Sequence, residues 1–349
     1  LAIENELKAP GSNEYGRVDR VAGWFLLARM YLNAQTWINE NKYQEAYAYA
    51  VKVIADGHYP LASDYREIFL ADNNTCKEII WPLVQDGLRA QSSAGTNFYV
   101  KAFVNGPMDE LYKTGVGSRG WGNVRAKVSL VDAFDADDVM FDGNDTWGNN
   151  KKDKRAQFMT ALPNQVKDIW DVNMDMTSTF TCGYGYIKWR NVTKEDELCP
   201  SGDAYTSIDF PLFRTADAYL MAAEAILRGA NGTQSEALGY VNEVRTRAYM
   251  SGKYAKNGVR SDVSGEITAN ELNLDFLLVE RQKELASELT RRTDLIRFGK
   301  YTKGNNWDWK NGVRLGADVD DKYNLFPIPE SELTNNPTLV QNDGYKVIK

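Results

Sequence analysis

Apolar side chains in the first part of the chain recur every three or four residues, which is the spacing of an amphipathic helix. The pattern runs from about Val18 to Asp56, is broken by polar residues 39–41, and stops at Gly57. Alanines stand where the two predicted helices cross, so their backbones can approach closely. The pattern therefore predicts an antiparallel helix pair, of the size of one ~34-residue helical repeat.

The same helical spacing of apolar residues recurs from Phe213 onward. One predicted helix ends at the break Gly229–Gly232, the next runs through Ala248, a third begins near Glu271, and a short fourth covers Asp294–Tyr301. Helix pairs of this kind stack on one another, because each pair buries a face that its neighbour completes. We therefore expect tetratricopeptide-like helix pairs near both ends of the chain.

Between these helical segments, residues 73–210 lose the helical periodicity. Glycine, asparagine, aspartate and aromatic residues dominate, and short pieces such as 78–81 and 184–189 have an extended character. A stretch of this length without strong periodicity is usually functional, because a rigid scaffold presents binding residues on its loops. We therefore interpret the helices as the scaffold and the loops as the ligand-recognition surface.

The predicted fold is mostly α-helical, with tetratricopeptide-like helix pairs, a large loop-rich insertion and little β-structure. Its parts are a helical pair in residues 1–72, a loop-rich ligand-recognition region in residues 73–210, and a helical scaffold with an extended tail in residues 211–349. We expect these three parts to form one integrated unit.

The charge and hydropathy of the chain restrict its partners. A formal net charge of −7 and an isoelectric point near 5.1 argue against a nucleic-acid-binding protein, which normally carries a basic face. The longest apolar run, Val21–Ala28, is far shorter than the ~20 residues of a membrane-spanning helix. We therefore expect neither a nucleic-acid partner nor a segment that crosses a bilayer.

Histidine and cysteine restrict the available chemistry further. His58 is the only histidine and follows the helix stop, so metal sites with several histidines are excluded and histidine-based catalysis is nearly ruled out. The three cysteines, Cys76, Cys182 and Cys199, form no CxxC pair, which argues against a zinc cluster. A bridge between Cys182 and Cys199 in an exported chain stays open.

One segment is dense in carboxylates: Asp132, Asp135, Asp137, Asp138, Asp142 and Asp145. Such groups can bind calcium or, as a pair, catalyse glycoside hydrolysis. Their spacing fits no EF-hand loop, and residues 142–145 have the composition of a turn. We interpret the segment as a solvated acidic loop and expect no cofactor, with a structural calcium ion as the alternative.

A series of short motifs follows in a fixed order along the helical parts and the tail. They are Gly16–Ala22, Leu27–Leu32, Phe213–Ala225, Val241–Ala248, Glu280–Leu285, Arg292–Gly299, Leu325–Leu333 and Gln341–Tyr345. Together they resemble the SusD/RagB family of outer-membrane nutrient-binding lipoproteins, and the resemblance covers essentially the whole chain. The middle loops match least, which is typical of a variable binding region.

The resemblance implies a non-catalytic receptor at the surface of the outer membrane. Proteins of this family bind a polysaccharide or an oligosaccharide and act as lids over a SusC-like, TonB-dependent transporter. Members normally begin with a lipoprotein signal, a lipidated cysteine and an N-terminal helical region, so we expect the lipid anchor, as the sole membrane attachment, to lie outside this chain. The charged residues of the helical motifs are then expected to form interhelical salt bridges and caps. These residues are Arg214, Glu224, Arg245, Arg247, Glu280, Arg281, Glu284 and Asp294.

Other functions compete with glycan uptake. The cargo could be an oligopeptide, or the helix grooves could bind a partner protein as tetratricopeptide scaffolds do. A glycoside hydrolase is a further alternative. A scaffold would expose side chains on concave helix faces, a receptor would expose aromatic rings in residues 90–150, and a hydrolase would place two carboxyl groups about 5–10 Å apart in a cleft.

Sugar binding in water depends on aromatic rings. The C–H face of a pyranose stacks on Trp or Tyr, while its hydroxyl groups need polar partners that replace the lost water. In the family that the chain resembles, exposed aromatics of the middle region contribute to the glycan surface, which by position selects Tyr99 and Trp121. Glycines flank Trp121 and leave its faces uncovered. The candidate ligand-binding residues are Trp121, Tyr99, Phe98, Asn97, Arg119, Asn123 and Trp147.

Overall fold

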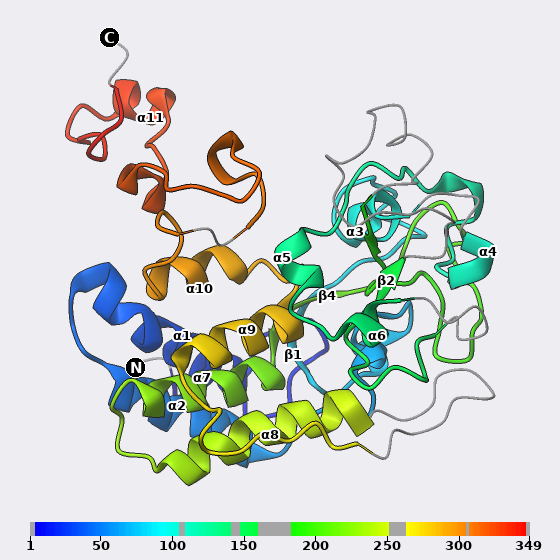
Figure 1. The fold of residues 1–349 in the computed structure, drawn as a ribbon, viewed down its shortest axis with the longest axis horizontal. Coiled ribbons are helices and arrows are strands. Elements are labelled where there is room, and N and C mark those ends of the chain that lie inside the picture. The colour runs from blue at the N-terminus through cyan, green and yellow to red at the C-terminus, as the bar shows by residue number, and fades with distance from the viewer. Residues whose placement is uncertain are drawn as a thin grey trace. The chain divides into compact units, whose positions relative to one another are not determined.

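The computed structural model describes residues 4–104, 109–140, 147–159, 183–250, 263–304 and 307–346. The chain divides into two compact units, Leu1–Leu289 and Thr290–Lys349. Helices and loops dominate the described part, and its strands form two short antiparallel pairs (Figure 1). This composition confirms the prediction of a mostly helical chain with little β-structure, whereas the division into three parts stays a prediction.

The first helical pair follows the sequence pattern closely. Helix α1 (Arg20–Ile38) begins where the Asp19 carboxylate accepts two backbone N–H groups, and it ends at Asn39 in the left-handed region. Helix α2 (Tyr43–Asp56) ends at Gly57, whose φ of 78° suits glycine. The predicted break and the predicted stop are therefore confirmed.

Helix α7 (Thr215–Leu227) is the centre of the helical scaffold. It lies side by side with α2 and packs against α8 (Gln234–Met250) and α9 (Leu274–Leu285) (Figure 1). Its alanines, such as Ala222 and Ala225, are fully buried and let the neighbouring backbones approach closely. A helix that is apolar on nearly all sides is typical of such a central position.

Two strands connect this scaffold to the loop-rich region. Strand β1 (Ile79–Leu83) pairs antiparallel with β4 (Phe210–Arg214). Since α7 follows β4 without a linker, the ladder continues directly into the central helix. A second short pair, β2 (Phe158–Met159) with β3 (Gly185–Tyr186), lies within the loop-rich region.

The loop-rich region consists of short helical turns on an aromatic core. Trp189 is buried at its centre and contacts Phe69, Tyr99 and Phe210, with ring centroids 4.9–5.5 Å apart. This core gives the loops a rigid support. The turn η1 (Tyr65–Phe69) precedes this region. The helical elements that the structure describes within it are η2 (Asn73–Thr75), α3 (Thr96–Ala102), α4 (Asp109–Tyr112), η4 (Gly117–Arg119), α5 (Val128–Val131) and α6 (Ala136–Val139).

A network of buried ion pairs joins the loop-rich region to the helices. Glu284 of α9 contacts Arg155, Arg214 and Arg247, which come from a loop, from β4 and from α8. All four side chains are buried. The Arg247 contact joins α8 to α9 and confirms an interhelical salt bridge expected from the helical motifs, whereas the other two join α9 to a loop and to a strand. Further pairs of this network are Arg155–Asp153, Arg155–Glu280, Arg214–Glu78, Arg214–Glu288, Arg245–Glu280, Arg247–Glu78 and Lys188–Glu288.

The C-terminal unit contains α10 (Arg291–Arg297), the turns η7 (Lys310–Gly312) and η8 (Asp321–Asn324), and α11 (Glu330–Asn335). A tail with little regular structure follows α11. Among the residues that the structure describes, no helix has the length and apolar character required to cross a membrane.

Candidate functional site

Helix α3 presents the first group of candidate residues. It begins after Gly95, whose φ of 65° and ψ of −143° suit glycine alone, and a Cβ there would lie 2.7 Å from Gln85 Oε1. The hydroxyl group of Thr96 donates to the carbonyl of Ile208 (2.7 Å), which fastens the first turn to the aromatic core. The start of α3 is thus held by a glycine and a buried hydrogen bond.

The three candidates on α3 lie in different surroundings. Asn97 is buried, and its amide donates to the carbonyl of Ser92 (3.0 Å), so it supports the preceding loop. Tyr99 is half-buried: its ring stacks on Trp189, and burial raises the pKa of its hydroxyl group. Phe98 points outward with 42% of its surface exposed. Of these three residues, Phe98 offers the largest ring surface to a ligand.

The backbone around Trp121 fixes this residue beside Phe98. Four successive N–H groups, beginning with its own, donate to the carbonyls of Lys101, Ala102 and Val104 over 2.8–3.1 Å. Carbonyls at a helix terminus have no intrahelical partners, so the segment satisfies the end of α3. Trp121 stays 40% exposed, and its ring centroid lies 6.1 Å from that of Phe98 at an interplanar angle of 60°. Phe98 and Trp121 together form the exposed ring pair.

An apolar pocket of about 410 Å³ opens next to the exposed ring pair. Its lining comes from the end of β1, the loop before α3, α3 itself, β4 and the end of the first unit. The lining residues are Leu83, Gln85, Ala94, Gly95, Phe98, Tyr99, Phe210, Leu212 and Leu289. Sequence reasoning named Phe98 and Tyr99 but missed the pocket, because the rest of its lining comes from segments that are distant in the chain and that no local pattern joins.

A polar rim flanks Trp121. Arg119 at the end of η4 forms an exposed ion pair with Asp203 (Nε to Oδ1, 3.0 Å), and Asn123 is exposed two residues after the ring. Lys101 is buried; its ammonium group donates to the carbonyl of the residue after Asp203, and burial lowers its pKa. The exposed guanidinium, amide and carboxylate groups provide donors and acceptors for hydroxyl groups.

Trp147 does not belong to this surface. It is 3% exposed, and the Arg190 guanidinium lies 4.4 Å from its ring centroid. Its carbonyl accepts a hydrogen bond from Arg66 (2.9 Å), and Gly148 beside it has a φ of 66°. The expectation of an exposed ring at Trp147 is therefore wrong, because a ring next to a glycine can still be covered by an arginine that is distant in the sequence.

The acidic segment lies only partly within the described residues, since Asp142 and Asp145 fall outside them. Asp138 is buried and accepts the backbone N–H groups of Lys152 (2.7 Å) and Asp153 (3.0 Å). Within the described ranges, no group of three or more His, Cys, Asp or Glu side chains is arranged to hold a metal ion. A structural calcium ion in this segment stays an untested prediction.

The thiols and the imidazole lie away from the apolar pocket. Cys76 and Cys199 are buried free thiols, and burial raises the pKa of Cys76 to about 12. Cys182 lies outside the described residues, so its pairing with Cys199 is not tested. His58 is exposed, with its Nδ1 2.7 Å from Asp56 Oδ1.

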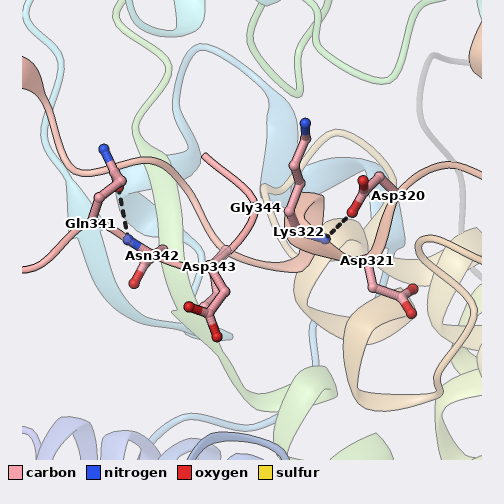
Figure 2. Close-up of a pocket in the computed structure, with 8 residues that line it drawn as sticks. Asp320, Asp321, Lys322, Gln341, Asn342, Asp343 and Gly344 are labelled. Atoms are coloured by element: carbon pink, nitrogen blue, oxygen red, sulfur yellow. Dashed lines mark hydrogen bonds between the residues drawn. The ribbon is translucent and has the colours of Figure 1, made fainter. Parts of the chain in front are cut away.

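The C-terminal unit has a cavity of its own, of about 510 Å³ (Figure 2). Asp320, Asp321 and Lys322 line one side, and residues 341–344 of the tail line the other. The acids have local partners: Asp320 accepts the backbone N–H of Lys322 (2.9 Å), and Asp321 accepts from the hydroxyl group of Thr302 (2.6 Å). Its described lining residues include no aromatic ring, so this cavity lacks the main feature of a sugar site.

Comparison with known sequences identifies the family. Residues 77–345 match the sequence model of the SusD family. The starch-binding protein SusD of Bacteroides thetaiotaomicron is 33% identical, over 99% of this chain and 63% of that relative. The chain therefore spans less than two thirds of this relative's length.

Solved structures have the same fold. A SusD-like protein from Bacteroides fragilis gives a TM-score of 0.65 at 21% identity, covering 98% of this chain and 68% of that protein. Surface glycan-binding protein A from Bacteroides thetaiotaomicron, in complex with laminarihexaose, gives a TM-score of 0.61 at 22% identity, covering 97% of this chain and 67% of that protein. On the strength of the family match and the sequence identity, the chain belongs to the SusD family.

Proposed function

We propose that this protein binds glycans at the cell surface without modifying them and delivers them to a SusC-like, TonB-dependent transporter of the outer membrane. The observation that carries the proposal is the exposed ring pair, Phe98 and Trp121, fixed on a rigid backbone next to a polar rim. Two similar proteins support it: one is named a starch-binding protein, and the other was solved with laminarihexaose. The transporter, the lack of catalysis and the lipid-anchored location at the outer membrane are proposed from family membership.

We expect stacking on these rings to give weak binding. Hiding roughly 60–80 Å² of apolar surface is worth about 1.5–2 kcal/mol per ring. Two such contacts reach about 4 kcal/mol, which corresponds to a dissociation constant of about 1 mM. Arg119, Asn123 and Asp203 surround the ring pair with groups that can bond sugar hydroxyls. We therefore expect the affinity to rise with the number of sugars bound at once.

The angle between the two rings bears on the shape of the glycan. Sugars stacked on Phe98 and Trp121 differ in orientation by the interplanar angle of 60°. A coiled glycan, such as an α-1,4- or a β-1,3-linked glucan, presents its sugar faces in this manner, whereas the faces of a flat β-1,4-linked ribbon stay parallel. The ring pair therefore favours a curved oligosaccharide.

Isothermal titration calorimetry with maltoheptaose and with laminarihexaose tests the proposal. The wild-type protein is expected to bind at least one of them, and Trp121→Ala is expected to lower that affinity about tenfold, because one stacking platform is lost. Phe98→Ala is expected to weaken binding as well. Trp37→Ala is the matched control, since Trp37 is an exposed tryptophan of α1 outside this surface.

Two results would speak against the proposal. Wild-type affinity in both Trp121→Ala and Phe98→Ala, with unchanged thermal stability, would remove the binding site from the exposed ring pair. No binding of the wild-type protein to either oligosaccharide, nor to soluble amylose in affinity electrophoresis, would contradict the glycan-binding function.

A further inference from the structure

A third cavity, of about 400 Å³, lies next to β1. Pro82 lines this cavity, whereas the next residue, Leu83, lines the apolar pocket. Because these two residues are adjacent in the chain, the two hollows lie next to the same end of β1. The volume falls within the range of ~300–1,000 Å³ that is typical of small-ligand sites.

Tyr15 provides an aromatic ring in this cavity. It is 49% exposed, and its hydroxyl group donates to Asp209 Oδ2 (2.5 Å). Asp209 is buried, and its other carboxylate oxygen accepts the backbone N–H of Gln85 (2.7 Å), a residue that lines the apolar pocket. The ring is therefore held by its hydroxyl group while half of its surface stays open, and one carboxylate connects the walls of both hollows.

Polar side chains surround this ring. Asn13, Arg17, Asn74 and Lys77 line the cavity together with Tyr15. Within the described part of the chain, the Asn74 amide and the Lys77 ammonium group have no hydrogen-bonding or ion-pair partner. Such uncommitted donors and acceptors can replace the water that a hydroxyl-rich ligand loses on binding.

We propose that this cavity is a second saccharide-binding subsite, which takes sugars of the same glycan that stacks on Phe98 and Trp121. The proposal rests on the function proposed above. A half-exposed ring beside uncommitted amide and ammonium groups suits a sugar, which stacks its C–H face on the ring and bonds its hydroxyl groups to the polar side chains. The two subsites reinforce each other, because binding at one raises the effective concentration of the glycan at the other.

Titration of maltoheptaose and laminarihexaose into Tyr15→Ala and Asn74→Ala tests this subsite. Both substitutions are expected to lower the affinity for the oligosaccharide that the wild type binds, Tyr15→Ala by about tenfold, because one stacking contact is lost. Asn74 is exposed, so Asn74→Ala is expected to keep the wild-type melting temperature. Trp37→Ala is again the control and is expected to bind as the wild type does.

Three results would overturn the second subsite or its premise. Wild-type affinity in both Tyr15→Ala and Asn74→Ala, with weaker binding by Trp121→Ala, overturns the subsite and leaves the proposed function standing. A loss confined to Tyr15→Ala also overturns it, because Tyr15 then acts on the first site through Asp209 and Gln85. Absence of binding by the wild-type protein contradicts the proposed function itself.

Discussion

The backbone conformation at single glycines helps to fix the position of α3 and of the exposed ring pair. Gly95 turns the chain into α3, and a Cβ at this position would lie 2.7 Å from the Gln85 side chain. Gly57 at the end of α2 also has a positive φ, but a Cβ there would meet no atom within 4 Å. Gly95 also has a ψ of −143°, a combination that only glycine adopts, whereas Gly57 has a ψ of −2° in the left-handed region.

We expect Gly95→Ala to lower the free energy of unfolding by more than Gly57→Ala does. Gly57→Ala is expected to cost about 1–2 kcal/mol, the penalty for an alanine in the left-handed region. Gly95→Ala must place an alanine in a backbone region that only glycine adopts and must also move the Gln85 side chain, so it is expected to shift α3 and to weaken glycan binding. Urea unfolding measures both variants, and equal costs would contradict the requirement for glycine at position 95.

Glu284 makes the stability of the protein sensitive to acid. Burial raises its pKa, but Arg247, Arg214 and Arg155 lower it to about 2, from an ordinary value of 4.5. As the pH falls, the unfolded chain takes up this proton before the folded chain does. The stability that Glu284 contributes is therefore complete above about pH 4.5 and is lost between about pH 4.5 and 2.

Glu284→Gln tests this dependence on pH. At pH 7 it is expected to lower the free energy of unfolding by about 3–5 kcal/mol, because three arginines lose a buried partner. In urea unfolding between pH 7 and 3, the difference from the wild type is expected to shrink as the pH falls. A difference that stays constant would contradict the prediction. Glu243→Gln, at an exposed position of α8, is the control and is expected to have little effect.

Lys188 is expected to give a pH dependence at the alkaline end. Burial lowers its pKa to about 8, from 10.5, although Glu288 acts in the opposite direction. Between about pH 8 and 10.5 the unfolded chain keeps a proton that the folded chain has released, so this group makes the stability rise with pH. Lys188→Met, which leaves Glu288 paired with Arg214 (2.6 Å), is expected to reduce that rise. An unchanged rise in unfolding free energy between pH 8 and 10 would contradict this assignment.

Residue types alone do not distinguish exposed rings from covered ones. Trp121 and Trp147 each stand beside a glycine, yet Arg190 covers the ring of Trp147, whereas the ring of Trp121 is exposed. Phe98 and Tyr99 are adjacent in α3, yet Phe98 faces solvent and Tyr99 faces the aromatic core. Exposure depends on contacts between distant parts of the chain, and these contacts leave no local signature in the sequence.

At the scale of elements, the sequence predicts helices better than strands. Periodicity predicts α1, α2, α7 and α8, because each of them buries a stripe against its neighbours. Helix α9 begins at Leu274, after the Asn273 cap, and not near Glu271 as the pattern indicates. The pairing of β1 with β4 is not predicted, because a short strand carries no pattern that specifies a partner far along the chain.

Helices α7 and α8 are expected to respond in opposite ways to added methyl groups. Ala225→Leu in α7 is expected to lower the free energy of unfolding by about 1–3 kcal/mol, because the position is fully buried among packed helices. Gly239→Ala in α8 is expected to raise it by about 0.5–1 kcal/mol, since a Cβ there would meet no atom within 4 Å. Urea unfolding measures both, and a stabilised Ala225→Leu would contradict the close packing of α7.

For the molecule as a whole, buried charge is concentrated where the loop-rich region meets the helices. Arg155, from that region, pairs with Glu280 and Glu284 of α9, and all three side chains are buried. Buried ion pairs are costly to desolvate, and any other docking arrangement would leave one of these charges unpaired. The network therefore favours a single placement of the loop-rich region on the scaffold, although it adds little to the total stability.

The hydrogen bonds between the segment at Trp121 and the end of α3 also affect how long a ligand stays bound. Ordering a flexible segment on binding costs about 1–2 kcal/mol of backbone conformational entropy per residue. Here the ordering takes place during folding, so an arriving sugar meets a backbone that is already fixed. Stacking of a few kcal/mol is then sufficient for capture, and it is weak enough for rapid release. A short residence time is what the proposed role in delivery requires.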